Sequence, residues 1–154
     1  MATRTKKPVT KSVNGKTQAA RMTEMKPQIG LSDDQREGVV DLLNRHLANA
    51  YVLYTKTRNY HWNVRSPRFI MLHAFFEEQY TLLEAAIDEY AERALQLGGF
   101  ALGTLNEFMK VATLKEEPGV YPDAQTMVQN LLSDHETVIR ALREDCLLYT
   151  SRCV

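Results

Sequence analysis

Two histidines and two carboxylates are the residues of this chain with the clearest potential for metal chemistry. His61 and His73 are twelve positions apart, and Asp88 and Glu92 are separated by four, which places both acids on one face of a helix. Imidazole nitrogen and carboxylate oxygen, with no thiolate among them, suit Fe(II), Mn or Zn, whereas Cu(I) and iron–sulfur clusters prefer sulfur. The pattern predicts a site for a divalent transition metal.

Further polar residues extend this pattern along the same predicted helix. At about 100° per residue, five side chains fall within about a quarter of the helix circumference, beside an apolar stripe. These are His73, Glu77, Glu84, Asp88 and Glu92. Carboxylates at such a border are costly to desolvate unless they are paired or bound to a cation. Taken singly, His73 is more typical of a packed histidine and each acid of a solvated face, so the metal prediction depends on the set.

The chain lacks the motif with which a single helical bundle usually binds two irons. No Glu-x-x-His occurs in the sequence. His61 is expected at the end of one long helix, and Asp88 lies about 21 residues into the next, which is about 30 Å along that helix. Since an antiparallel hairpin keeps His61 and Asp88 apart, a second chain packed head to tail is needed to bring them together.

Charge is distributed unevenly along the 154 residues, although the formal net charge is zero. Residues 1–26 contain seven basic side chains and one acidic side chain, so this segment carries +6 and the remainder carries −6. The first 30 residues show no apolar periodicity, which predicts a disordered basic arm on an acidic body. No apolar run is long enough for a membrane span, and the N-terminus lacks the apolar segment of a secretory signal. A cytoplasmic protein is expected.

The first long helix is predicted to begin at Ser32, where Gln35 would complete a capping box, and to run for about 30 residues. Its apolar face consists of Val40, Leu43, Leu47, Ala50, Tyr54 and His61. The segment 63–67 should end it.

The second helix is predicted to begin with Pro67 as its first residue, where the missing N–H costs nothing, and to end at Gly98 and Gly99. Its apolar stripe consists of Phe69, Leu72, Phe76, Tyr80, Leu83, Ile87 and Ala94. A short helical turn is expected at 104–110, and a third long helix should open at 121–123. No segment is predicted to be a strand.

The C-terminal segment 146–154 is similar to the translation of a sequencing-adaptor sequence. If this is its origin, the helical domain is truncated after about Asp145; the alternative is a native tail of the same sequence. Three long helices leave an antiparallel bundle incomplete. The predicted fold is therefore an all-α four-helix bundle whose fourth helix is missing from this chain, and apolar surface should be exposed where that helix would pack.

Several segments together resemble the Dps proteins, the DNA-binding proteins from starved cells. They are Tyr60-His61-Trp62-Asn63-Val64, His73, Phe76-Glu77-Glu78-Gln79-Tyr80, Ala86-Ile87-Asp88-Glu89-Tyr90-Ala91-Glu92-Arg93 and Leu97-Gly98-Gly99. The resemblance covers residues 31–145 and implies a ferritin-like domain. It further implies a twelve-subunit shell, associated with the nucleoid, that oxidises Fe(II), preferably with hydrogen peroxide, stores the ferric product and protects DNA from oxidative damage.

In that family the ferroxidase site lies between two subunits. The resemblance implies that His61 and His73 of one subunit and Asp88 and Glu92 of another bind iron as Fe²⁺ and Fe³⁺. Glu77 stands where the family often has a further Asp, so it is expected either to ligate iron or to support a ligand. Trp62 would intercept radical intermediates beside the site, or else pack as an aromatic residue at the helix end.

The basic arm resembles the Lys-rich arms with which some Dps proteins bind DNA. Contacts with phosphates are expected from Arg4, Lys6, Lys7, Lys11 and Lys16, and binding of this kind is independent of sequence and sensitive to salt. A solvated tail without a DNA role is the alternative. Two other readings of the whole chain stay open, namely a non-enzymatic DNA-compacting protein and a gene fragment that does not assemble.

Overall fold

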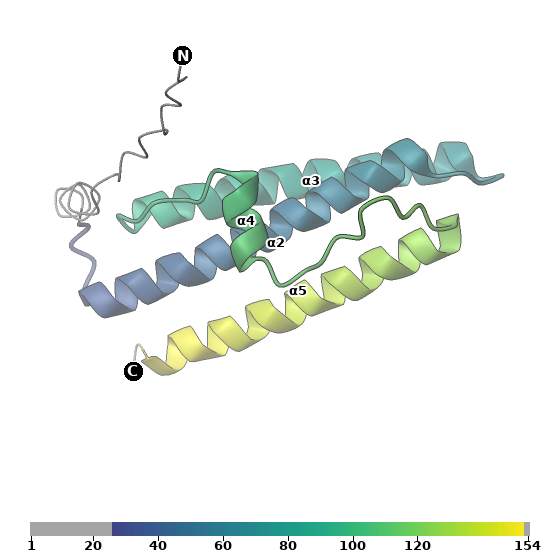
Figure 1. The fold of residues 1–154 in the computed structure, drawn as a ribbon. Coiled ribbons are helices and arrows are strands. Elements are labelled where there is room, and N and C mark those ends of the chain that lie inside the picture. The colour runs from purple at the N-terminus through teal and green to yellow at the C-terminus, as the bar shows by residue number, and fades with distance from the viewer. Residues whose placement is uncertain (1–25, 153–154) are drawn as a thin grey trace, which may run out of the picture.

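Four helices and no strand make up the part of the chain that the computed structural model describes, residues 26–152, of which 148–152 are described only as backbone. The helices are α2 (Asp33–Asn63), α3 (Phe69–Gln96), α4 (Leu105–Val111) and α5 (Ala124–Arg152). Figure 1 shows α2 between α3 and α5, with the short α4 in the long connection from α3 to α5. The predicted all-α fold is confirmed, with each long helix where the sequence indicates it.

The start of α2 is the capping box that the sequence predicts. The Ser32 hydroxyl accepts the backbone N–H of Gln35, and the Gln35 side chain accepts the backbone N–H of Ser32. These two bonds satisfy donors that a helix N-terminus otherwise leaves unpaired. The helix then runs for 31 residues to Asn63, which matches the expected length and places His61 in its last turn.

The start of α3 corrects the prediction by two residues. The helix begins at Phe69 rather than at Pro67, and Arg68 precedes it without a side-chain cap. The Phe69 N–H donates to the Ser66 carbonyl at 3.0 Å, so residues 66–69 close a turn before the helix begins. Proline is favoured at the second position of such a turn because its fixed φ fits there.

The end of α3 is the glycine stop that the sequence predicts. Gly98 has a φ of 75°, in the left-handed region where an L side chain is strained. Its N–H donates to the Leu95 carbonyl, and the Gly99 N–H donates to the Ala94 carbonyl. This pair of bonds is the Schellman arrangement, and it turns the chain sharply at the end of the α2–α3 hairpin remote from His61.

Two asparagines of α2 hold the connection between α3 and α5, which the sequence analysis did not foresee. The Asn44 side chain donates to the Phe100 carbonyl and accepts the Leu102 N–H. The buried Asn49 carbonyl oxygen accepts the N–H groups of Thr113 and Leu114. An amide carries both donors and acceptors, so one asparagine satisfies several backbone groups of an otherwise irregular segment.

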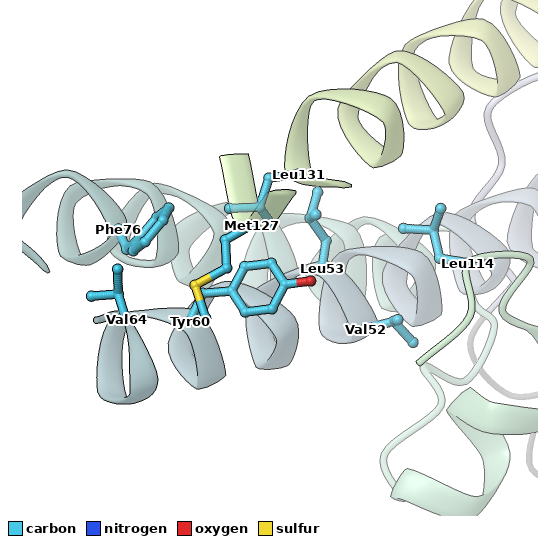
Figure 2. Packing of buried hydrophobic residues seen from close by; sticks show 8 residues of the cluster. All are labelled: Val52, Leu53, Tyr60, Val64, Phe76, Leu114, Met127 and Leu131. Carbon is cyan, nitrogen blue, oxygen red and sulfur yellow. The ribbon is translucent and has the colours of Figure 1, made fainter. Parts of the chain in front are cut away.

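The main apolar cluster lies where α2 meets α3 and α5, and Figure 2 shows its side chains converging between these helices. Its buried members are Val52, Leu53, Tyr60, Val64, Phe76, Leu114, Met127 and Leu131. Phe76 comes from the predicted stripe of α3, and Met127 and Leu131 come from α5. Burial of these faces stabilises the long helices, because propensity alone leaves a helix marginal.

Apolar side chains also remain on the surface of α3 and α5. Ile70 and Leu82 of α3 are 84% and 62% exposed, and Leu132 and Ile139 of α5 are 59% and 51% exposed. The described part of α5 continues through Arg152, so residues 146–152 of the adaptor-like segment are helical. No helix in the described range is long and apolar enough to cross a membrane.

Candidate metal centre

The α2–α3 hairpin brings His61 and His73 together. His61 lies in the last turn of α2 and His73 in the second turn of α3, and their rings stack with centroids 3.6 Å apart and planes inclined by 21°. His61 is only 7% exposed. The twelve-residue spacing thus corresponds to a close pair across the turn between the two helices.

Reciprocal hydrogen bonds fix the chemical state of this histidine pair. Nδ1 of His61 is 2.8 Å from the His73 carbonyl oxygen, and Nδ1 of His73 is 2.9 Å from the His61 carbonyl oxygen. Because a carbonyl oxygen only accepts, each Nδ1 must carry the proton. In the neutral rings the lone pairs then lie on Nε2, and within residues 26–152 no hydrogen bond occupies either Nε2. Histidines that bind metals are usually oriented in this way.

Asp88 and Glu92 lie farther along α3, whereas Glu77 is one turn beyond His73. Glu77, Asp88 and Glu92 are exposed, and Asp88 is 15 residues beyond His73, or about 22 Å along the helix. Among the residues that the structure describes, no group of three His, Cys, Asp or Glu side chains could hold a metal ion. The chain therefore brings the two histidines together but does not bring Asp88 or Glu92 to them.

An arginine lies against three aromatic side chains of α2 and α3. The Arg58 guanidinium carbon lies 5.1 Å from the ring centroids of both Trp62 and Tyr80 and 5.4 Å from that of Tyr54. Its Nη1 donates to the Tyr54 hydroxyl at 2.5 Å, and its buried Nε has no partner within the described residues. Trp62 is 64% exposed, so it lies over Arg58 and does not pack into the core.

Tyr80 links this arginine to the histidine pair. Its ring meets the His61 ring edge-on at 5.3 Å. Burial raises the pKa of Tyr80, and the negative charge of the nearby Glu77 raises it further, while Arg58 opposes the increase. From the sequence, Tyr80 was interpreted as a packed aromatic residue of the apolar stripe and of the Dps-like segment 76–80, rather than as a redox participant, and Arg58 was not identified. The available signal was the four-residue spacing of Tyr54, Arg58 and Trp62, which makes these side chains neighbours on the surface of α2.

The consecutive Asp134, His135 and Glu136 of α5 resemble metal ligands in sequence but point to different partners. Asp134 pairs with Lys56 of α2, and Glu136 pairs with Arg140 one turn further along α5. Burial lowers the pKa of His135. This segment stabilises the bundle and does not assemble a site in the described chain.

The predicted DNA contacts cannot be placed in this geometry. Arg4, Lys6, Lys7, Lys11 and Lys16 lie outside the described residues. Lys26, the last basic residue of the arm, is described, and it pairs with Asp33 in the first turn of α2.

Comparison with known proteins agrees with the fold. The Ferritin-like domain family matches residues 40–148. A Dps protein of Vibrio cholerae, described as a member of a broad superfamily of ferritin-like diiron-carboxylate proteins, superposes with a TM-score of 0.76 at 35% identity over 83% of this chain and 79% of that one. These matches define a ferritin-like helical protein.

Two relatives refine this assignment. The DNA protection during starvation protein of Brevibacillus brevis is 42% identical over 68% of this chain and 70% of that protein. An uncharacterized low temperature-induced protein of Nostoc is 50% identical over 75% of this chain, but the match spans only 65% of that relative. The chain belongs to the Dps family.

Proposed function

We propose that this protein is a Dps-type ferroxidase, which oxidises Fe(II) at sites shared by two copies of the chain and retains the ferric product. The observation that carries the proposal is the histidine pair, in which both Nδ1 atoms donate to carbonyl groups and both Nε2 lone pairs are left for a metal. Such a pair supplies two neutral nitrogen ligands, which is fewer than an iron site needs.

A second copy of the chain would supply the missing ligands. Asp88 and Glu92 are exposed on α3, and they lie too far along that helix to reach His61 or His73 of their own chain. In a two-fold contact each subunit presents the same surface, so the histidines of one chain meet the acids of the other twice. Asp88 and Glu92 of the partner subunit would then complete each site.

The residues divide the chemistry between them. Neutral imidazoles bind Fe²⁺, and the carboxylates offset the cationic charge and favour Fe³⁺. Glu77 would act either as a further ligand or by orienting one. Hydrogen peroxide needs two electrons to become two waters, and two Fe²⁺ ions supply them with two protons from solvent, so no hydroxyl radical is released. Trp62, beside His61, would intercept radicals that escape this reaction.

Mixing two inactive variants tests the shared site directly. One variant carries His61→Ala and His73→Ala, and the other carries Asp88→Ala and Glu92→Ala. Each alone should lose rapid oxidation of Fe²⁺ by peroxide. After the two are unfolded and refolded together, a hybrid two-fold contact contains one intact site, so random mixing should restore about a quarter of the sites.

The control for this experiment is each variant refolded alone and mixed only afterwards. If the ligands all came from one chain, co-refolding would restore no activity, and that result would contradict the shared site. Light scattering after size exclusion gives the mass of each assembly. We expect a particle of twelve subunits, as in the Dps resemblance, and a monomer that nevertheless oxidises iron rapidly would refute the proposal.

A second function, DNA protection, is favoured by the charge of the N-terminal segment. Residues 1–26 carry +6, and relatives such as that of Brevibacillus brevis are named for DNA protection during starvation. Cations on each subunit release counterions from DNA, and many copies on one particle multiply weak contacts. Replacing Arg4, Lys6, Lys7, Lys11 and Lys16 by Gln should abolish DNA binding in a gel-shift assay at low salt. Unchanged, salt-sensitive binding would exclude the N-terminal arm as the DNA-binding segment.

A further inference from the structure

A continuous row of aromatic rings leads from the histidine pair to α4. His61 meets Tyr80 with ring centroids 5.3 Å apart, and Tyr80 meets Tyr54 at 6.0 Å. Tyr54 meets Tyr51 at 6.4 Å, and Tyr51 stacks on Phe108 at 4.2 Å. These separations are those of aromatic rings in contact. The row therefore contains three consecutive tyrosines, and it begins at a candidate metal ligand.

We propose that Tyr80, Tyr54 and Tyr51 form a relay that carries an oxidising equivalent away from the histidine pair during iron oxidation. The relay rests on the proposed ferroxidase function, and it adds a route for electrons that the metal ligands alone do not provide. Trp62 does not belong to this route, because it is exposed and its ring lies over the Arg58 guanidinium.

Arg58 determines the form in which these rings can be oxidised. Its guanidinium lies over the rings of both Tyr80 and Tyr54, and its Nη1 donates to the Tyr54 hydroxyl. A fixed positive charge at this distance opposes a cationic radical. Tyr80 and Tyr54 therefore lose the phenolic proton together with the electron and become neutral radicals.

The first step applies when a single Fe²⁺ occupies a site and meets hydrogen peroxide. Peroxide takes one electron from Fe²⁺ and one from Tyr80, and its O–O bond breaks. The phenolic proton of Tyr80 and one proton from solvent complete two waters. The products are Fe³⁺, two waters and the Tyr80 radical.

The following steps move the radical and remove it. Tyr54 donates an electron to the Tyr80 radical and releases its proton to solvent, while Tyr80 recovers a proton. Tyr51 then reduces the Tyr54 radical in the same way. A second Fe²⁺ with one proton then reduces the Tyr51 radical to tyrosine and becomes Fe³⁺. The sum is two Fe²⁺ oxidised for each peroxide, so the relay allows a half-filled site to complete the two-electron reaction.

Freeze-quench electron paramagnetic resonance on the intact assembly tests the relay. The assembly is loaded with less than one Fe²⁺ per subunit and then mixed with hydrogen peroxide. Wild type should give a tyrosyl radical signal, and Tyr80→Phe, which keeps the ring and removes the phenol, should lose it. Tyr121→Phe is the matched control, because Tyr121 is 65% exposed and lies outside the row. With excess Fe²⁺, Tyr121→Phe should oxidise iron at the wild-type rate.

The outcomes separate the relay from the proposed function. A tyrosyl signal of equal size in Tyr80→Phe, or a wild-type signal located on tryptophan alone, would overturn the relay. Normal iron oxidation by wild type without any tyrosyl signal would also overturn the relay while leaving the ferroxidase proposal intact. Absence of iron oxidation by wild type would overturn both.

Discussion

His61 and His46 are both buried histidines of α2, and they are held in opposite ways. His61 donates from Nδ1 to a backbone carbonyl, which leaves Nε2 available. His46, which is 4% exposed, has its Nε2 2.7 Å from the Asp145 carboxylate, and its buried Nδ1 has no partner in the described chain. Since a carboxylate accepts, His46 must donate from Nε2.

This difference separates a candidate ligand from a structural residue. The backbone carbonyls orient the His61 and His73 rings without charge and leave the outer nitrogen of each free. Asp145 engages His46 and also accepts a forked pair of bonds from Nη2 of Arg45, with both N–O distances 2.8 Å. The Arg45–His46–Asp145 cluster thus attaches α5 to α2. Burial does not distinguish the two histidines, whereas the ring nitrogen that is hydrogen-bonded does.

The largest effect is expected when the pair itself is removed. His61→Ala with His73→Ala should lower the rate of Fe²⁺ oxidation by more than about 100-fold, because losing a ligand exceeds the roughly 10–100-fold cost of losing an outer partner. His46→Gln is the matched control in the same helix and should keep the wild-type rate. Stopped-flow absorbance of the ferric product measures both. An equal loss in His46→Gln would show that the two histidines do not differ in role.

The next largest effect is expected for stability at the other histidine. Asp145→Ala removes the acceptor of both His46 and Arg45 and should lower the free energy of unfolding by about 2–3 kcal/mol, since most of that cost comes from the buried imidazole and Arg45 is partly solvated. Urea denaturation measures the change. Asp145→Asn retains an acceptor and should lose less. Loss of iron oxidation by Asp145→Ala with an unchanged free energy of unfolding would contradict a purely structural role for His46.

A similar but smaller loss is expected at Asn49, which is 1% exposed. Asn49→Ala leaves the N–H groups of Thr113 and Leu114 without their acceptor and should cost about 1–3 kcal/mol. Zn²⁺ binding by the histidine pair, measured by calorimetry, should be unaffected because the pair lies at the far end of the main cluster. Asn106→Ala, at an exposed position on α4, serves as the control. A weakened Zn²⁺ affinity in Asn49→Ala would mean that the connection between α3 and α5 also supports the histidine pair.

The smallest effect is expected in a spectroscopic test that alters no residue. Long-range proton–nitrogen correlation spectra, recorded where the imidazoles are neutral, should show His61 and His73 protonated at Nδ1 and His46 protonated at Nε2. Added Zn²⁺ should shift Nε2 of His61 and His73 and leave His46 unchanged. Protonation of His61 at Nε2 would remove the basis for treating it as a ligand.

Much of the fold follows from local signals in the sequence. The capping box at Ser32, the glycine stop at Gly98 and the apolar stripes each act within a few residues, so they could be predicted without knowledge of the rest of the chain. Pro67 was misplaced because a proline fits both a helix start and a turn, and only the Phe69–Ser66 hydrogen bond distinguishes them.

The sequence by itself determined the helices, and it predicts the ligand types and the need for a second chain, because these predictions need only residue spacing and helix length. Tertiary structure alone decided which nitrogen of each histidine is free, that Arg58 lies among three rings, and that Tyr80, Tyr54 and Tyr51 form a row. These features join residues of different helices whose separation is set by packing. No local propensity specifies how one helix turns its side chains toward another.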